Sequence, residues 1–96
     1  MKEIYYTPHL KLRLKVRNFP ENYPLLIYKN PEMRFYDCVE KNEIAIKRLK
    51  YKRIIRNIMI AYEEKGNKIE LVTIHPISDE KIINRTLSGR WTKNER

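Results

Sequence analysis

The segment from Thr7 to Arg17 carries the clearest pattern of apolar and polar positions in the chain, and this pattern fits two secondary structures. From Leu10 to Arg17, apolar and basic residues alternate without a miss, as in a strand with one buried face. The same segment opens with Thr7 and Pro8, which are typical of the N-cap and first position of a helix. Local pattern alone leaves both interpretations open.

The helical interpretation places three basic side chains together. At about 100° per residue, His9, Arg13 and Arg17 lie on one helix face, four residues apart. Apolar residues flank this row on both sides: Leu10 and Leu14 on one, Leu12 and Val16 on the other. A helix of this kind would present a histidine and two arginines between apolar borders.

The rest of the chain predicts one α+β domain over residues 1–96, with a short N-terminal strand, two helices, a four-stranded antiparallel meander and a C-terminal helix. Short polar turns separate the four strands, and Ser78 with two acidic residues after it marks the start of the last helix. The predicted strands are Glu3–Tyr6, Met33–Val39, Glu43–Lys50, Arg53–Glu63 and Lys68–His75, and the predicted helices are Pro8–Asn18, Pro24–Lys29 and Ser78–Ser88.

Composition narrows the class of partner. Twenty-one Lys and Arg against twelve Asp and Glu give a formal charge of +9, which favours nucleic acid, an acidic protein or an anionic surface as partner, although a solvated basic surface is the plain alternative. No apolar run reaches the roughly 20 residues that span a bilayer, and the N-terminus lacks an apolar signal segment. The lone Cys38, read as a half-buried strand residue, fits a reducing cytoplasm.

Several short motifs resemble the domain-of-unknown-function 4258 family. They are the His9, Arg13 and Arg17 row, Asn30-Pro31-Glu32, Ile60-Ala61-Tyr62 and the closing Val72–Ile77 segment. That family is distantly similar to the BrnT and RelE/ParE toxins of toxin–antitoxin systems, which are small basic domains with an antiparallel sheet. The resemblance and the Thr7-Pro8 start together favour the helix.

The resemblance implies a RelE/BrnT-like fold and a metal-independent endoribonuclease. Its implied partners are RNA, including ribosome-associated mRNA, and an acidic antitoxin protein, with a homodimer left open. ParE-type relatives poison DNA gyrase instead, so the fold does not settle the function. A non-catalytic nucleic-acid-binding module and an antitoxin-type protein-interaction module remain as alternatives.

Cleavage of RNA without a metal requires a proton acceptor, a proton donor and positive charge at the phosphorus. Histidine and arginine supply these. The predicted catalytic residues are therefore His9, Arg13, Arg17 and His75, and the predicted nucleic-acid-binding residues are Arg85, Arg90, Lys47, Arg48 and Tyr62. No cofactor is expected, and one cysteine with two distant histidines makes no metal site.

Each candidate also has a structural interpretation. His9 would cap or pack, and His75 would bond to backbone at a strand end. Arg13 and Arg17 would bridge to an acidic residue, with Asp37, Glu40 and Glu43 as the candidates. Trp91 is expected to pack in the core beneath the final helix rather than to stack on a base.

Overall fold

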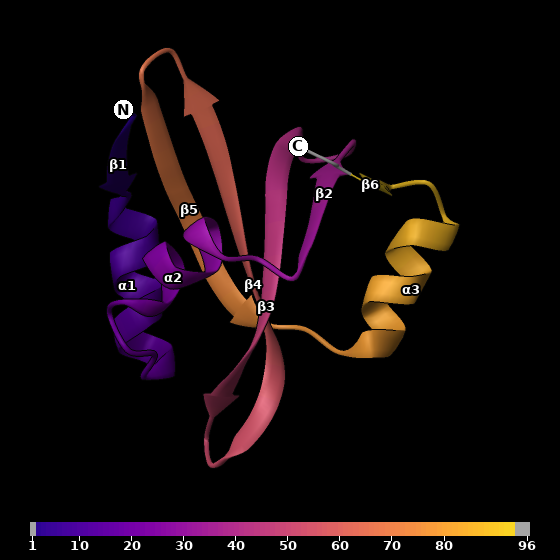
Figure 1. The fold of residues 1–96 in the computed structure, drawn as a ribbon, viewed down its shortest axis with the longest axis horizontal. Helices are drawn as coiled ribbons and strands as arrows, with labels where there is room; N and C mark the ends of the chain where they lie inside the picture. The colour runs from indigo at the N-terminus through magenta and orange to yellow at the C-terminus, as the bar shows by residue number, and fades with distance from the viewer. Residues whose placement is uncertain (1, 94–96) are drawn as a thin grey trace.

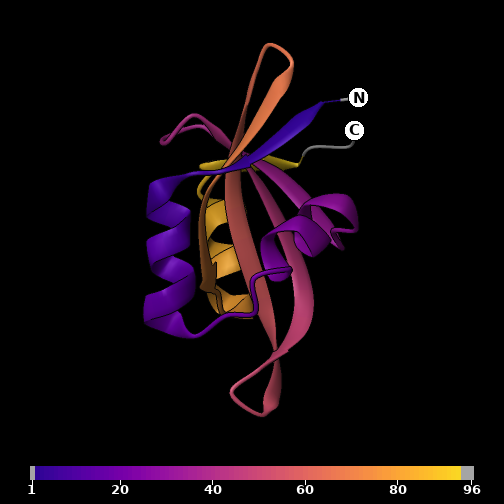
Figure 2. The same ribbon diagram turned by 90° about the vertical axis from the view of Figure 1, so that its left-hand side faces the viewer.

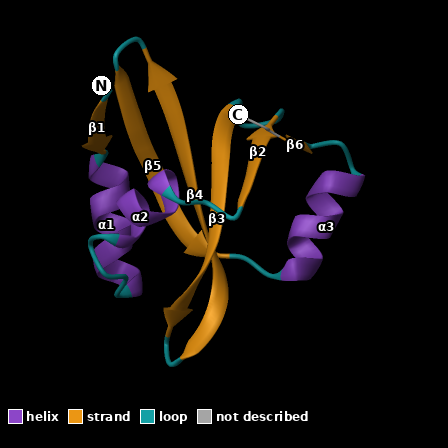
Figure 3. Ribbon diagram, viewed as in Figure 1, coloured by secondary structure: helices purple, strands orange, loops and turns teal. Residues whose placement is uncertain are grey.

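The computed structural model describes residues 2–93, which form three helices and a six-stranded mixed sheet (Figures 1 and 3). The α+β class is confirmed. In chain order the elements are β1 (Glu3–Tyr6), α1 (Pro8–Arg17), α2 (Tyr23–Lys29), β2 (Met33–Asp37), β3 (Asn42–Tyr51), β4 (Ile54–Lys65), β5 (Lys68–Pro76), α3 (Asp79–Leu87) and β6 (Trp91–Lys93).

The sheet has the order β1-β5-β4-β3-β2-β6. Strands β2 to β5 form the predicted antiparallel meander, and β1 pairs in parallel with β5 at one edge. The predicted count of five strands is wrong, because β6 adds a sixth at the opposite edge. It pairs antiparallel with β2, placing Trp91 opposite Asp37.

Helices cover both faces of the sheet (Figures 1 and 2). On one face, α1 and α2 bury Leu10, Leu14 and Ile27 against alternate strand residues such as Ile58 and Ile60. On the other face, α3 contributes Ile82 to a second core. That core also holds Phe35, Ile44, Ile46, Met59, Ala61, Ile77 and Trp91. Because side chains alternate along a strand, the register decides which face each polar residue occupies.

The N-terminal segment is a helix, as its start signal predicts. The Thr7 side chain accepts a hydrogen bond from the Leu10 N–H at 3.1 Å, and Asn18 ends the helix in the left-handed conformation at φ 55°. Only one apolar border of the basic row is buried. Leu10 and Leu14 lie in the core, whereas Leu12 and Val16 are exposed.

The structure corrects two local predictions. Strand β2 ends at Asp37, two residues before the predicted end, because the Asp37 carboxylate accepts the N–H groups of Val39 and Glu40 and turns the chain. Cys38 consequently lies in this turn and is exposed, not half-buried in a strand. Across residues 2–93, the helices are too short or too polar to cross a bilayer.

Candidate functional site

A cavity of about 300 Å³ lies on the α3 side of the sheet and gathers residues from both ends of the chain. Helix α1 contributes His9, and β5 contributes His75. Arg85 comes from α3 and Arg90 from the segment before β6. Four residues that the sequence nominated separately therefore meet at one cavity, whose volume is at the small end of ligand pockets.

His75 is half-buried on the α3 side, opposite Met59 in the β4–β5 register. Its Nδ1 lies 3.1 Å from the Pro76 carbonyl oxygen. Since a carbonyl oxygen only accepts, this bond requires the proton on Nδ1 and leaves the lone pair of Nε2 free. The bond to backbone, expected as the structural alternative, thus also prepares the ring as a proton acceptor.

The surroundings of His75 favour its neutral form. Burial lowers the pKa of His75, and the nearby positive charges of Arg17, Lys81 and Arg85 lower it further. The hydrogen bond to the Pro76 carbonyl acts in the opposite direction but does not reverse the shift. The lowered pKa therefore favours the uncharged ring that a general base requires.

The basic row of α1 reaches this cavity only through His9, because Arg13 and Arg17 are not among the residues that line it. His9 is exposed, and its Nε2 accepts a long hydrogen bond of 3.4 Å from Nε of Arg13. Arg13 and Arg17 are half-buried, and Arg17 lies close enough to His75 for its charge to act on that ring. The structure thus brings His9 and the charge of Arg17 toward the second histidine, which spacing along the helix alone does not show.

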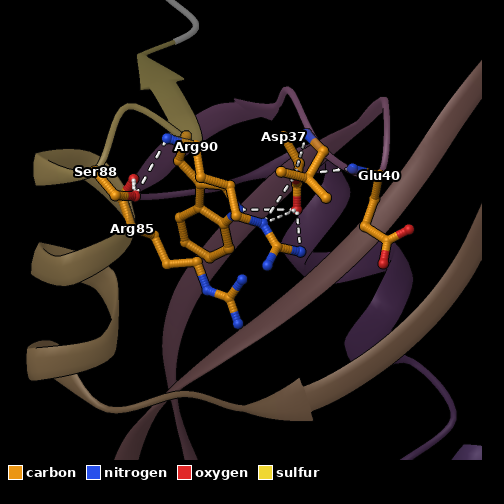
Figure 4. A network of polar contacts seen from close by, with 7 residues as sticks. Asp37, Glu40, Arg85, Ser88 and Arg90 are labelled. Carbon is orange, nitrogen blue, oxygen red and sulfur yellow. Dashed lines mark hydrogen bonds and ion pairs between the residues drawn. The ribbon is translucent and has the colours of Figure 1, made fainter.

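The Asp37 carboxylate is the centre of a hydrogen-bond network in the lining of the cavity (Figure 4). It is almost fully buried and binds the Arg90 guanidinium through both oxygens, with Nε 3.1 Å from Oδ1 and Nη2 3.1 Å from Oδ2. Nε1 of Trp91 donates to Oδ2 at 3.0 Å. Burial raises the pKa of the Asp37 carboxyl, but the bonds from Arg90, Glu40, Trp91 and Val39 outweigh it and lower the pKa to about 2.

Arg85 and Arg90, both predicted to contact phosphate, have different partners in the structure. Arg90 is held by Asp37, one of the three acidic residues proposed from the sequence as partners of Arg13 and Arg17. Arg85 instead lies with its guanidinium carbon 5.6 Å from the centre of the Trp91 ring. Trp91 is 3% exposed and stacks on Phe35 at 5.3 Å, which confirms its expected place in the core.

Three predicted contacts lie outside this cavity. Tyr62 is buried on the α1–α2 side, where its hydroxyl accepts a hydrogen bond of 2.9 Å from Arg34, and burial raises its pKa. Lys47 lies on the same side by strand alternation. Arg48 is exposed on the α3 side, nearer to the β3–β4 turn.

The cavity also contains polar residues that were not predicted as site residues. Glu40, Asn42 and Thr73 line it, and the Oδ1 atom of Asn42 is buried without a hydrogen-bond partner among residues 2–93. Glu40 comes from the turn between β2 and β3, whose position depends on the Asp37 bonds, and Asn42 is the first residue of β3, opposite Asp37. Only the sheet register brings them to the histidines.

A larger groove of about 1310 Å³ lies on the other side of α1 and is lined by β1, α1 and the α1–α2 connection. Its lining is mostly apolar, with Lys11 and Lys15 among its members, and it contains neither histidine. Within residues 2–93, no three His, Cys, Asp or Glu side chains form a group that could hold a metal ion. The cavity that contains the two histidines is therefore smaller than this groove.

Comparison with known proteins gives no further constraint. No family model, curated protein or solved structure matches this chain. The functional argument therefore rests on the geometry of the cavity.

Proposed function

We propose that this protein is a toxin-like, metal-independent endoribonuclease with a RelE/BrnT-like variant of the α+β fold, acting on RNA in the cytoplasm. The observation that carries the proposal is the meeting of the chain's two histidines with Arg85 and Arg90 in one cavity. Two imidazoles and an excess of arginine match the needs of phosphodiester cleavage, which requires proton transfer and stabilisation of negative charge.

The proposed reaction is an internal transesterification. Nε2 of His75 removes the proton from a ribose 2′-hydroxyl, and the 2′-oxygen attacks the adjacent phosphorus. The bond from phosphorus to the 5′-oxygen breaks, and His9 donates a proton to that leaving oxygen. The products are a 2′,3′-cyclic phosphate and a 5′-hydroxyl, and proton exchange with water restores both rings.

The side-chain environments support these separate roles. His75 is held neutral by burial and nearby cations, which suits the base. His9 is exposed at the rim, where it can exchange protons with water, which suits the acid. Protonation of Nε2 breaks the long contact with Arg13, and Arg13 then becomes available to the phosphate. Arg85 lies with its guanidinium carbon 5.6 Å from the centre of the Trp91 ring, and its N–H donors suit the phosphoryl oxygens.

The test is cleavage of a 12-nucleotide RNA in EDTA, with the products identified by mass spectrometry. We expect a 2′,3′-cyclic phosphate end, and a loss of roughly a hundredfold or more in kcat/KM for His75→Ala, His9→Ala and Arg85→Gln. Lys11→Gln is the matched control, because Lys11 is exposed in the other groove. Undiminished cleavage by all three variants would remove these residues from the mechanism, and salt-sensitive binding without cleavage would indicate a non-catalytic nucleic-acid-binding module.

A second candidate function, docking of an acidic partner such as an antitoxin, is favoured by the outer face of α1. Leu12 and Val16 are 58% and 65% exposed and stand next to Lys11 and Lys15 in the sequence. An amphipathic acidic segment would match both the apolar and the charged positions. Coexpression with a small acidic product of a neighbouring gene tests this second function. If the partner binds the outer face of α1, Leu12→Glu should abolish the complex without altering the cavity.

A further inference from the structure

The β3–β4 hairpin is the most basic segment of the molecule. Six of the ten residues from 47 to 56 are cationic and none is acidic: Lys47, Arg48, Lys50, Lys52, Arg53 and Arg56. All except Lys47 are exposed. The turn extends beyond the helices on both sides of the sheet (Figures 1 and 2). This concentration of charge carries no role in the reaction described above.

Strand register connects the hairpin to the cavity. His75 stands opposite Met59, and Arg48 stands opposite Asn57, two residues further along β4 on the same face. Lys50 follows Arg48 after two more residues, on that face again. Arg48 and Lys50 therefore follow one another at about 7 Å along β3, on the face that holds His75 and in the direction of the turn.

Two tyrosines fix the hairpin to the helical layer. The Tyr51 hydroxyl donates to the Arg17 carbonyl oxygen at 2.6 Å, and the Tyr23 hydroxyl donates to the Lys50 carbonyl oxygen at 2.6 Å. Arg17 ends the basic row of α1 beside His75. The hairpin and the cavity therefore keep a fixed relation to one another, as two parts of one binding surface require.

The turn itself holds cations where another pair of residues would fit better. Lys52 and Arg53 have φ values of 51° and 72°. A two-residue turn with positive φ at both positions favours Asn-Gly, because long side chains are strained there. This chain instead has two exposed cationic residues at the tip of the turn. Because these residue types are uncommon at positive φ, their presence indicates that the charge has a function.

We propose that the β3–β4 hairpin is a nucleic-acid backbone-binding arm and that the substrate is an RNA chain extending from the cavity along Arg48 and Lys50 to the turn. This inference rests on the proposal that the cavity takes RNA. Phosphate is the ligand that such a row of cations selects. Tyr51 is the hairpin's aromatic residue and is buried, so the arm grips the backbone and does not stack on bases.

A membrane surface is the competing partner for a basic hairpin. The exposed apolar residues Ile54 and Ile55 are consecutive in β4, so their side chains point to opposite faces of the hairpin. They do not form a single apolar face that could enter a lipid surface. The arrangement therefore favours a polyanion in solution over a bilayer.

The test measures binding of the intact wild-type protein to a 12-nucleotide 2′-O-methyl RNA. This RNA lacks the attacking hydroxyl and cannot be cleaved, so binding is measured independently of catalysis. The variant Lys52→Asn/Arg53→Gly removes two charges and supplies the favoured turn residues, so its melting temperature should not fall. The control Lys41→Asn/Lys65→Gln removes two charges elsewhere, one of them also at positive φ.

We expect the hairpin variant to bind roughly tenfold more weakly in 50 mM salt and to lower the slope of log affinity against log salt by about 1.4. The control should change affinity by less than about twofold, because its charges lie outside the proposed contact. Equal weakening of both variants, no weakening of the hairpin variant, or binding to phosphatidylserine vesicles in place of RNA would overturn the inference. A duplex of the same length shows whether the arm takes single strands or helices. If the protein cleaves no RNA but its RNA binding still depends on the hairpin, the catalytic proposal is wrong and the binding proposal stands.

Discussion

At the scale of single residues, the charge state of His75 is set by what surrounds it. Its own element offers the Pro76 carbonyl, whereas α1 and α3 bring Arg17, Lys81 and Arg85 toward it. Burial and these cations lower the pKa of His75, and the carbonyl raises it by less. The net effect is a pKa below the ordinary value for histidine.

This predicts that Lys81→Gln raises the pKa of His75, because the substitution removes a nearby positive charge. NMR titration of the His75 Cε1–H measures the shift directly, without any assumption about activity. If the protein cleaves RNA, the acidic limb of the kcat/KM profile moves to higher pH by the same amount. Lys29→Gln, on the opposite helical layer, is the control, and an unchanged titration in Lys81→Gln would contradict the assignment.

At the scale of elements, Asp37 joins β2, the β2–β3 turn and β6. It receives hydrogen bonds from Arg90, Trp91 and two backbone N–H groups of the turn. Strand β6 has only three residues, so its pairing with β2 depends on these side-chain bonds more than a long strand would. The same contacts fix the wall of the cavity that faces the histidines.

Asp37→Asn is therefore expected to destabilise the protein by about 3 kcal/mol, because it leaves the Arg90 charge without its carboxylate. The folded pKa of about 2 lies below the ordinary 3.8, so the carboxylate contributes stability above pH 3.8 that is lost as the pH falls toward 2. This contribution amounts to about 2 kcal/mol. Urea unfolding, followed by the fluorescence of Trp91, should show the wild type and variant converging over that pH range.

Glu40→Gln is the control for this measurement, because only the backbone N–H of Glu40 contacts Asp37. Its free energy of unfolding should stay within about 0.5 kcal/mol of the wild type. Parallel curves for wild type and Asp37→Asn between pH 2 and 5 would show that the ion pair does not stabilise the fold. Faster amide exchange at Trp91 and Thr92 in Asp37→Asn would locate the loss in β6.

Local sequence signals predicted most helices and strands, but they failed where an element depends on residues distant in the chain. The Thr7-Pro8 start fixed α1 against the strand alternative, and turn residues between apolar runs marked the meander. Strand β6 carries no such signal, since three residues show no periodicity and their pairing is decided by β2. The end of β2 was misplaced for a related reason: the Asp37 side chain turns the chain inside an otherwise strand-like run.

The candidate site was predictable in part for the same reason. Spacing along α1 grouped His9, Arg13 and Arg17, because helical geometry is local. Which face of the sheet a strand residue occupies depends on register, and a bulge at Ala61 and Tyr62 shifts the register between β4 and β5. Sequence alone therefore did not show that Tyr62, a predicted nucleic-acid contact, lies on the opposite face of the sheet from His75.

At the scale of the whole molecule, charge is distributed unevenly between the two long hairpins, whose turns lie at opposite ends of the sheet (Figure 1). Near the β4–β5 turn, lysines pair with glutamates, as in Lys65 with Glu70. The β3–β4 end carries cations with no acidic residue between 47 and 61. The field of the protein therefore attracts a polyanion to one end, next to the cavity.

If cavity and hairpin form one surface, catalysis should depend on the length of the RNA. A trinucleotide reaches only the cavity, whereas a 12-nucleotide RNA also reaches the turn and should show a lower KM. Lys52→Asn/Arg53→Gly should remove this advantage, raising KM for the long RNA roughly tenfold while leaving trinucleotide cleavage unchanged. Arg85→Gln should lower kcat/KM for both lengths, because its contact is with the reacting phosphate. An equal loss for both lengths in the hairpin variant would mean that the turn acts on the cavity itself and is not a separate arm.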